Sequence, residues 1–217
     1  MYLKQTKMRK IRIILLLFLF AFVIVSCTSK EYDEEVIVKL VNVDEQQSLS
    51  MGLIIIHEED VSFNYLNRVA PSYLESLAEY GSPDDFIKIA KSNPNVVRVI
   101  KIDEIIKPNE SKNITFKIRG EKDLKISIFQ MAMQSNDGFV FVDSRDLIID
   151  KKLIKRTHQA LNLDAGTEKN FLLGGGFNVG QPDLNRGSDN IDNGIETNEL
   201  VNIHTQLNDV ILEVSVE

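Results

Sequence analysis

Two short acidic stretches carry the residue types best suited to chemistry in this 217-residue chain. The stretch "QSNDGFVFVD" places Asp137 in an Asn-Asp-Gly turn that leads into a strand, and "LNLDAGTEKNF" places Asp164 and Glu168 in a loop that contains Gly166. Clustered carboxylates on loops can hold a hard cation, because Ca²⁺ takes six to eight oxygen ligands. Turns in which each acid caps a nearby backbone amide are the alternative that spacing alone leaves open.

Asp164 and Glu168 could instead form an acid and base pair of the kind that glycosidases use. No apolar segment surrounds them that would separate their pKa values. The chain also lacks a G-x-S-x-G or H-E-x-x-H motif, and its only cysteine, Cys27, has another use described below. We therefore expect binding rather than turnover, and no enzymatic activity.

The patterning around these loops predicts which elements position them. Period-2 alternation and β-branched residues indicate strands, whereas two segments with helical spacing lie together in one connection. Gly81 should end the first helix, and Ser82 should cap the second, with Pro83 in its first turn. Together these features predict an all-β protein, an antiparallel β-sandwich with two short helices. The expected strands cover residues 36–43, 51–57, 96–106, 113–119, 124–133, 139–149 and 209–217.

Three other features are weaker candidates for a metal or phosphate site. An EF-hand alignment of "DNIDNGIETNEL" puts Ile191 and Leu200 where oxygen ligands belong. The glycines of "GGGFNVG" do not lie in a strand-turn-helix unit, so we interpret them as a loop. His57 and His204 each end an apolar run. They are expected to be packing histidines, with a shared metal site as the alternative.

The N-terminus has the features of an export signal. Residues 1–26 contain five basic residues, no acid and an apolar run from Ile13 to Val25, which is too short to span a membrane. The segment ends in "IVSC", which resembles the lipobox of bacterial lipoproteins. The resemblance implies cleavage before Cys27 and attachment of diacylglycerol to its sulfur.

The predicted mature chain is strongly acidic. Removing residues 1–26 leaves 20 of the 25 basic residues and all 32 acids, so nucleic acid is an improbable partner and cations or basic surfaces are favoured. We interpret residues 27–35 as an acidic tether and 36–217 as one domain. The acidic cluster is either a solvated linker or, by resemblance to some Bacteroidota-type lipoproteins, a surface-export signal. The expected location is the bacterial cell envelope, lipid-anchored in the outer membrane.

Residues 36–204 resemble the spondin N-terminal domain family. The motifs that carry the resemblance are "IIIHEED", "PSYLESLAEYGSPDDFI", "NPNVV", "QMAMQSNDGFVFVD" and "LDAGTEKN". The family implies a C2-like β-sandwich whose two loops bind calcium, and the matching ligands here are Asp137, Asp164 and Glu168. In the animal proteins the position that matches Glu168 resembles an aspartate. The longer glutamate side chain leaves ligation possible but changes how far the carboxylate reaches. Adhesion or recognition of an envelope protein or polysaccharide is the implied role; a structural envelope component and a hydrolase are the alternatives.

Overall fold

The computed structural model describes residues 33–119, 122–168, 196–205, 207 and 211–217, which belong to one compact unit, Asp33–Glu217. The predicted signal segment, Cys27 and the first part of the tether lie outside the described residues. So does the glycine-rich segment 174–194.

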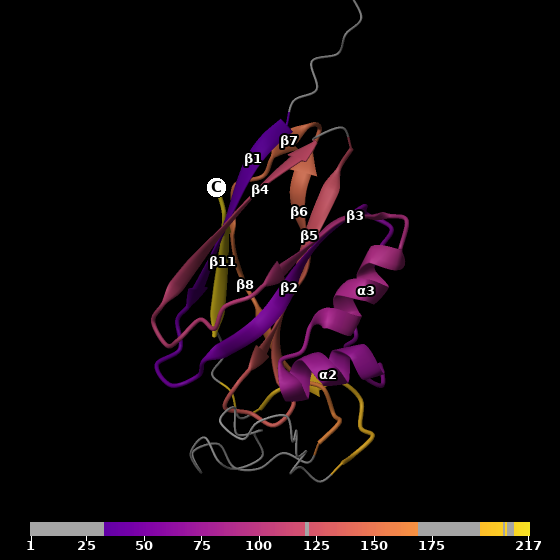
Figure 1. The fold of residues 1–217 in the computed structure, drawn as a ribbon, viewed down its shortest axis with the longest axis vertical. Coiled ribbons are helices and arrows are strands. Elements are labelled where there is room, and N and C mark those ends of the chain that lie inside the picture. The colour runs from indigo at the N-terminus through magenta and orange to yellow at the C-terminus, as the bar shows by residue number, and fades with distance from the viewer. Residues whose placement is uncertain (1–32, 120–121, 169–195, 206, 208–210) are drawn as a thin grey trace, which may run out of the picture. The chain divides into compact units, whose positions relative to one another are not determined.

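The described strands form two antiparallel sheets, which confirms the predicted all-β class (Figure 1). The smaller sheet has the strand order β4-β1-β11-β8, and the larger has the order β10-β9-β6-β5-β2-β3, with β7 paired to β6. The bounds are β1 Asp33–Asn42, β2 Leu49–His57, β3 Val96–Ile102, β4 Ser111–Arg119, β5 Leu124–Ala132, β6 Gly138–Ile149, β7 Lys152–Leu153, β8 Thr157–Gln159, β9 Leu161–Asp164, β10 Asn202–Ile203 and β11 Leu212–Val216.

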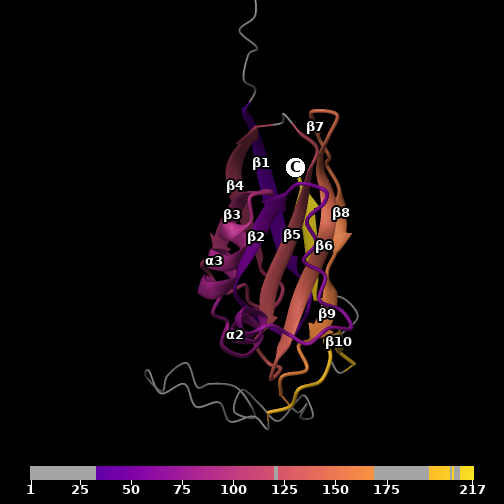
Figure 2. The same cartoon turned by 90° about the vertical axis from the view of Figure 1, so that its right-hand side faces the viewer.

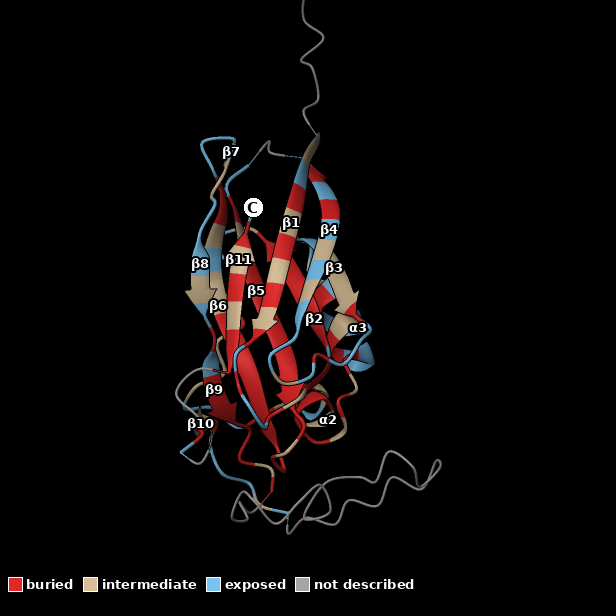
Figure 3. Ribbon diagram, turned by 90° about the vertical axis from the view of Figure 1, so that its left-hand side faces the viewer, coloured by how far each residue is buried: buried red, intermediate tan, exposed pale blue. Residues whose placement is uncertain are grey.

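One core lies between the two sheets. Alternate residues of β1 face it, and Val36, Val38 and Leu40 are fully buried there (Figure 3). The opposite face of the smaller sheet is open to solvent, so β4 alternates between exposed and more buried positions. This alternation is the signal that made the outer strands predictable from sequence.

A second core lies between the larger sheet and two helices, α2 Ser72–Tyr80 and α3 Asp84–Ser92 (Figure 2). The ring of Phe129 on β5 lies 4.9 Å from that of Phe86 on α3 and 4.6 Å from that of Phe141 on β6. Because the central strands of this sheet are covered on both faces, β2 and β5 are almost continuously buried.

The helix ends differ in how well the sequence predicted them. Gly81 ends α2 in the left-handed conformation, with φ of 61°, as expected. The predicted cap at Ser82 is wrong, because α3 begins at Asp84 with Pro83 at the N-cap position and no capping side-chain hydrogen bond. Asp84 instead forms a salt bridge of 2.7 Å with Lys101. Neither described helix is long and apolar enough to cross a membrane.

Strand β1 begins earlier than the predicted domain boundary at residue 36. Asp33 lies opposite Arg119 and Glu35 opposite Lys117 in the register with β4. Opposite charges on adjacent strands are mutually stabilising, by about 0.2–1 kcal/mol a pair. The last three acidic positions of the expected tether therefore belong to the sheet.

The stretch 157–164 crosses from one sheet to the other. Thr157–Gln159 pair with β11 in the smaller sheet, whereas Leu161–Asp164 pair with β6 in the larger sheet. We predicted a loop over 161–171, and its first four residues are strand instead. This crossover places Asp164 at the end of a paired strand rather than on a free turn.

Replacing Phe129 with alanine should cost about 3–5 kcal/mol of unfolding free energy, because it empties the centre of the helix-facing core. Urea denaturation followed by circular dichroism measures the loss. Val97→Ala on the edge strand β3, where the side chain is half exposed, is the control and should change stability by less than about 0.5 kcal/mol. A loss below 1 kcal/mol for Phe129→Ala would contradict the packing described here.

Candidate functional site

Asp137 is the buried centre of the candidate site. It precedes β6 in a turn where the Ser135 hydroxyl donates to the Ala132 carbonyl at 2.6 Å and accepts from the Gly138 amide at 3.0 Å. A Cβ atom at Gly138 would lie 2.3 Å from that hydroxyl oxygen, so the turn requires glycine there. The turn fixes the direction of the Asp137 side chain.

The pairing of β9 with β6 brings the second acidic stretch to this turn. Asp164 lies opposite Gly138 in the register, and the Ala165 amide donates to the Asp137 carbonyl at 3.0 Å. The Gly166 amide then donates to Asp164 Oδ1 at 2.8 Å, and Gly166 has a φ of 70°. Asp164 therefore forms the Asx-turn that the sequence had left open as an alternative.

The loop after Asp164 closes over one oxygen of Asp137. Asp137 Oδ2 accepts from the Thr167 amide at 2.8 Å, the Thr167 hydroxyl at 3.2 Å and the Glu168 amide at 3.0 Å. The other oxygen, Oδ1, is buried and has no hydrogen-bond donor among the described residues. One oxygen therefore holds the loop, and the other takes no part in holding it.

The electrostatic environment of Asp137 disfavours its negative charge. Burial raises the pKa of this carboxyl group above its ordinary value, and the nearby charge of Asp164 raises it further. The donors from Thr167 and Glu168 lower it, but their effect is smaller. A bound cation would reverse this balance, because a positive charge stabilises both carboxylates.

A segment that the sequence analysis had not connected with the site supports the loop from outside. The Thr197 amide donates to the Thr167 carbonyl at 2.7 Å, and the Thr197 hydroxyl and Glu199 amide both donate to the Gly166 carbonyl. Alanine at Gly166 would bring a Cβ atom within 2.8 Å of the Glu199 backbone. Short polar segments of this kind carry no periodic signal, so only the structure reveals them.

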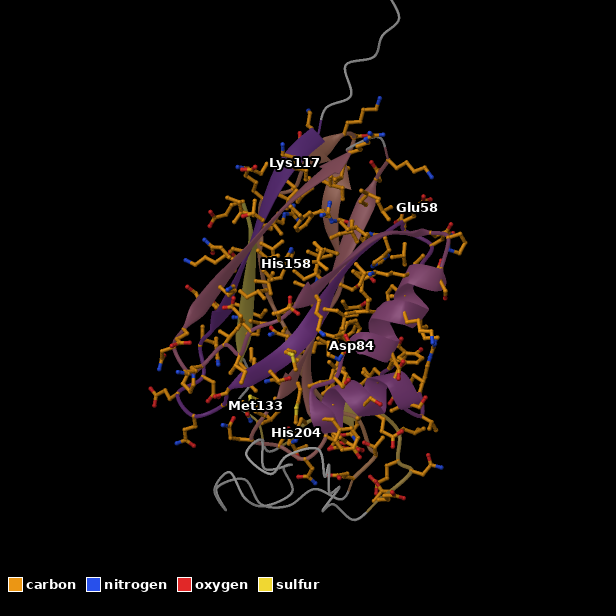
Figure 4. The ribbon with its side chains drawn as sticks, viewed as in Figure 1. Glu58, Asp84, Lys117, Met133, His158 and His204 are labelled. Carbon is orange, nitrogen blue, oxygen red and sulfur yellow. The ribbon has the colours of Figure 1, made fainter. Side chains whose placement is uncertain are left out.

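His204 also belongs to this neighbourhood. It follows β10, its amide donates to the Asn162 carbonyl at 2.9 Å, and its ring lies near Gly138. Figure 4 labels His204 near the lower end of the strands, below α2 in that view. Burial lowers its pKa, whereas the charge of Asp164 raises it. The apolar run that ends at His204 was visible in the sequence, but its proximity to Asp164 was not.

The structure brings Asp137 and Asp164 together and attaches Glu168 to Asp137 through its backbone amide. Within the described ranges, no group of three or more His, Cys, Asp and Glu side chains stands close enough to hold a metal ion. The three predicted acids alone therefore do not form a closed cage. Calcium would also need carbonyl or water oxygens, which it accepts readily. The buried, donor-free Oδ1 of Asp137 is the feature that fits such an ion.

His57 lies away from this site, so the described structure does not bring His57 and His204 together into the shared metal site that was the alternative. It pairs with Lys125 near the start of β5, whereas the acidic site lies beyond the other end of that strand. Its Nδ1 lies 2.8 Å from the Glu58 carbonyl oxygen and its Nε2 lies 3.0 Å from the Ser127 hydroxyl. Both ring nitrogens thus have hydrogen-bond partners within or next to the larger sheet.

The fold and the site define a class: an antiparallel β-sandwich in which two adjoining acidic loops meet at the end of a sheet. The Spondin_N family model matches residues 42–174, more than half of the chain, and the chain belongs to this family. The match contains Asp137, Asp164 and Glu168. No curated protein matches the chain.

The three histidines predict a loss of stability in mild acid. Burial is the main cause that lowers the pKa of His57, His158 and His204 below 6.5 in the folded state. The unfolded chain therefore takes up protons first as pH falls through 6.5, and stability drops until the folded pKa values are reached. Each histidine can contribute up to about 1.4 kcal/mol per pH unit.

Urea denaturation at pH 7.5, 6.5 and 5.5 measures this effect. His57→Gln keeps hydrogen-bonding groups near Ser127 but cannot titrate, so its stability should fall less steeply with pH than that of the wild type. A stability difference between wild type and His57→Gln that stays constant from pH 7.5 to 5.5 would show that His57 is not held neutral in the folded protein.

Proposed function

We propose that this spondin-domain protein is a lipid-anchored module of the bacterial cell envelope that binds calcium and acts in adhesion or recognition. The observation that carries the calcium part is the buried Oδ1 of Asp137, which has no donor among the described residues and lies beside a second acid, Asp164. Buried carboxylate oxygens are normally paired, so an oxygen without a donor is chemically suited to a cation.

Calcium fits these loops better than a softer metal. The available groups are carboxylates and backbone carbonyls, which are hard oxygen ligands, and Asp137, Asp164 and Glu168 are the residues that would hold the ion. The bound ion would neutralise the two neighbouring acids and order the loop that spans 164–168. An affinity of about 10⁻⁴ to 10⁻³ M is typical of extracellular modules.

Binding, rather than catalysis, is the role proposed for the acidic loops. Asp137 Oδ2 and Asp164 Oδ1 are both occupied by backbone amides of the same loop, which fixes the loop in place. A general acid or base needs a proton that it can exchange with a substrate. Carboxylates that clamp a loop are better placed to shape a surface, and recognition follows from that surface.

Asp137→Asn separates the charge of this residue from its loop contacts. The amide oxygen can accept from Thr167 and Glu168, while the buried negative charge is removed, so the calcium-free variant should be at least as stable as the wild type. Free Ca²⁺ at ten times Kd should stabilise the wild type by about 1.4 kcal/mol and the variant hardly at all.

Thermal unfolding with EDTA and with Ca²⁺, together with calorimetric titration, checks this prediction. Asp143→Asn lies on the same strand but bonds to Asn64 outside the site, so it should keep the calcium response. Asp164→Ala should lose it. Equal heats for wild type and Asp164→Ala, or none from either, would remove calcium from the proposal.

The lipid anchor depends on Cys27, the only cysteine of the chain. Cys27→Ala should therefore move the protein from the detergent phase to the aqueous phase in a phase-separation experiment, because acyl burial contributes about 0.8 kcal/mol per CH₂ group. Ser26→Ala is the neighbouring control and should keep the anchor. The mass of the mature N-terminal peptide should show a diacylglyceryl cysteine, and an unmodified Cys27 in the native protein would refute the anchor.

A further inference from the structure

Strand β1 leads directly from the proposed anchor into the folded domain. Only residues 28–32 separate Cys27 from Asp33, where β1 begins. The strand then runs along the smaller sheet and ends at Asn42, at the other end of that sheet (Figure 1). A pull on Cys27 would therefore reach the domain through the first residue of β1.

The acidic loops lie at the end of the domain where β1 finishes, which we call the acidic end. After the turn that follows β1, Leu49 begins β2 and pairs with Ala132 at the end of β5. Asp137 lies in the turn between β5 and β6, and Asp164 ends the strand beside it. A ligand held by these loops and an anchor at Cys27 would load the domain from opposite ends, along the direction of its strands.

Strand β1 is paired on both sides. Residues 33–41 pair with 111–119 of β4. Residues 38–42 pair with 212–216 of β11. Both partners are antiparallel, and the hydrogen bonds between antiparallel strands are perpendicular to the strands. A pull along β1 therefore loads all of these bonds at once, as shear, whereas a pull across the strand breaks them one after another and needs less force.

The side chains of β1 oppose sliding as well. Val36, Val38 and Leu40 face the core between the two sheets and are fully buried. A slip of one residue would turn each of these side chains to the solvent face. The strand therefore resists a pull along its axis through its packing in addition to its hydrogen bonds.

Hydrogen bonds connect the end of β1 with the turn that carries Asp137. The side-chain amide of Asn42 donates to the Gln47 carbonyl at 2.8 Å. Gln47 Oε1 accepts from the backbone amide of Gln134 at 2.5 Å, and Gln134 Oε1 accepts from that of Ser48 at 2.6 Å. The two glutamines thus hold the turn after β1 to the turn before β6.

Arg98 makes a second connection between the two sheets. It belongs to β3 in the larger sheet, and its guanidinium group donates to the Lys117 carbonyl of β4 at 2.8 Å. Its guanidinium carbon lies 5.6 Å from the centroid of the Phe116 ring. Load that passes from β1 to β4 can therefore reach the larger sheet, which carries the acidic loops.

Building on the lipid anchor and the recognition role proposed above, we propose that this domain bears tension between Cys27 and a ligand at its acidic end, with β1 loaded in shear. The resistance comes from the pairing of β1 with β4 and β11, so it requires neither calcium nor lipid. It is also directional. The Glu217 amide donates to the Ile37 carbonyl at 3.0 Å, so a pull between Cys27 and Glu217 would peel β1 and β11 apart from one end.

Optical tweezers test this direction dependence on the unlipidated mature chain, residues 27–217, in which Cys27 is the only native thiol and takes one DNA linker. Lys107→Cys or Glu217→Cys takes the second linker. Lys107 is exposed and precedes β4 at the acidic end. The rupture force should be at least about twofold higher with the Lys107 linker, because that pull shears β1 from β4 across all of their hydrogen bonds.

Equal rupture forces in the two geometries, or a lower force with the Lys107 linker, would overturn the tension-bearing role. The measurement needs neither calcium nor acyl chains, so this failure would leave the proposed function standing. Conversely, an unmodified Cys27 in the native protein would remove the anchor without changing the rupture forces.

Two buried valines provide matched variants. Val38 lies on β1 and Val201 in the helix-facing core, and both side chains are fully buried. Val38→Ala and Val201→Ala should both lower stability in urea, because each leaves a cavity of similar size. Only Val38→Ala should lower the rupture force with the Lys107 linker, since forced unfolding follows the rate at which the loaded element gives way. An equal drop in both variants, or no drop in Val38→Ala, would refute the assignment to β1.

Discussion

The hydrogen bonds that Asp137 accepts from Thr167 and Glu168 organise one end of the larger sheet. They hold the 164–168 loop against the turn before β6, and through the Gly166 and Thr167 carbonyls they also fix the segment that leads to β10. Charge-assisted hydrogen bonds contribute about 1.5–3 kcal/mol each, so a carboxylate that accepts several can hold a loop without periodic structure of its own.

The negative charge of the Asp137 carboxylate is electrostatically unfavourable in this environment. Burial of an ionised group costs several kcal/mol, and the second acid beside it adds repulsion. The direction of the Asp137 pKa shift decides which effect is larger: the pKa is raised, so desolvation and repulsion outweigh the donors. A fold that retains two buried acids at this cost is consistent with a requirement for their charge, and a cation is the partner that would offset it.

The sequence predicted the parts of this structure that have strong periodicity. Alternation identified β4, and the helical spacing with Gly81 identified α2, because each element buries one face against a core. It failed where partners distant in the chain decide the conformation. Strands β8 and β9 are only three and four residues long, and they exist as strands because β11 and β6 lie beside them.

The candidate site, like the fold, could be predicted from the sequence only in part. Asp137, Asp164 and Glu168 could be selected from their types and from family resemblance, and the structure places the first two side by side. The positions of Thr197 and His204 could not be predicted, because they come from contacts between segments distant in the chain, namely the bridge between Glu168 and Glu196 and the pairing of β10 with β9. The charged start of β1 was also missed. Acids are poor strand formers, and only their basic partners across the strand make Asp33 and Glu35 acceptable there.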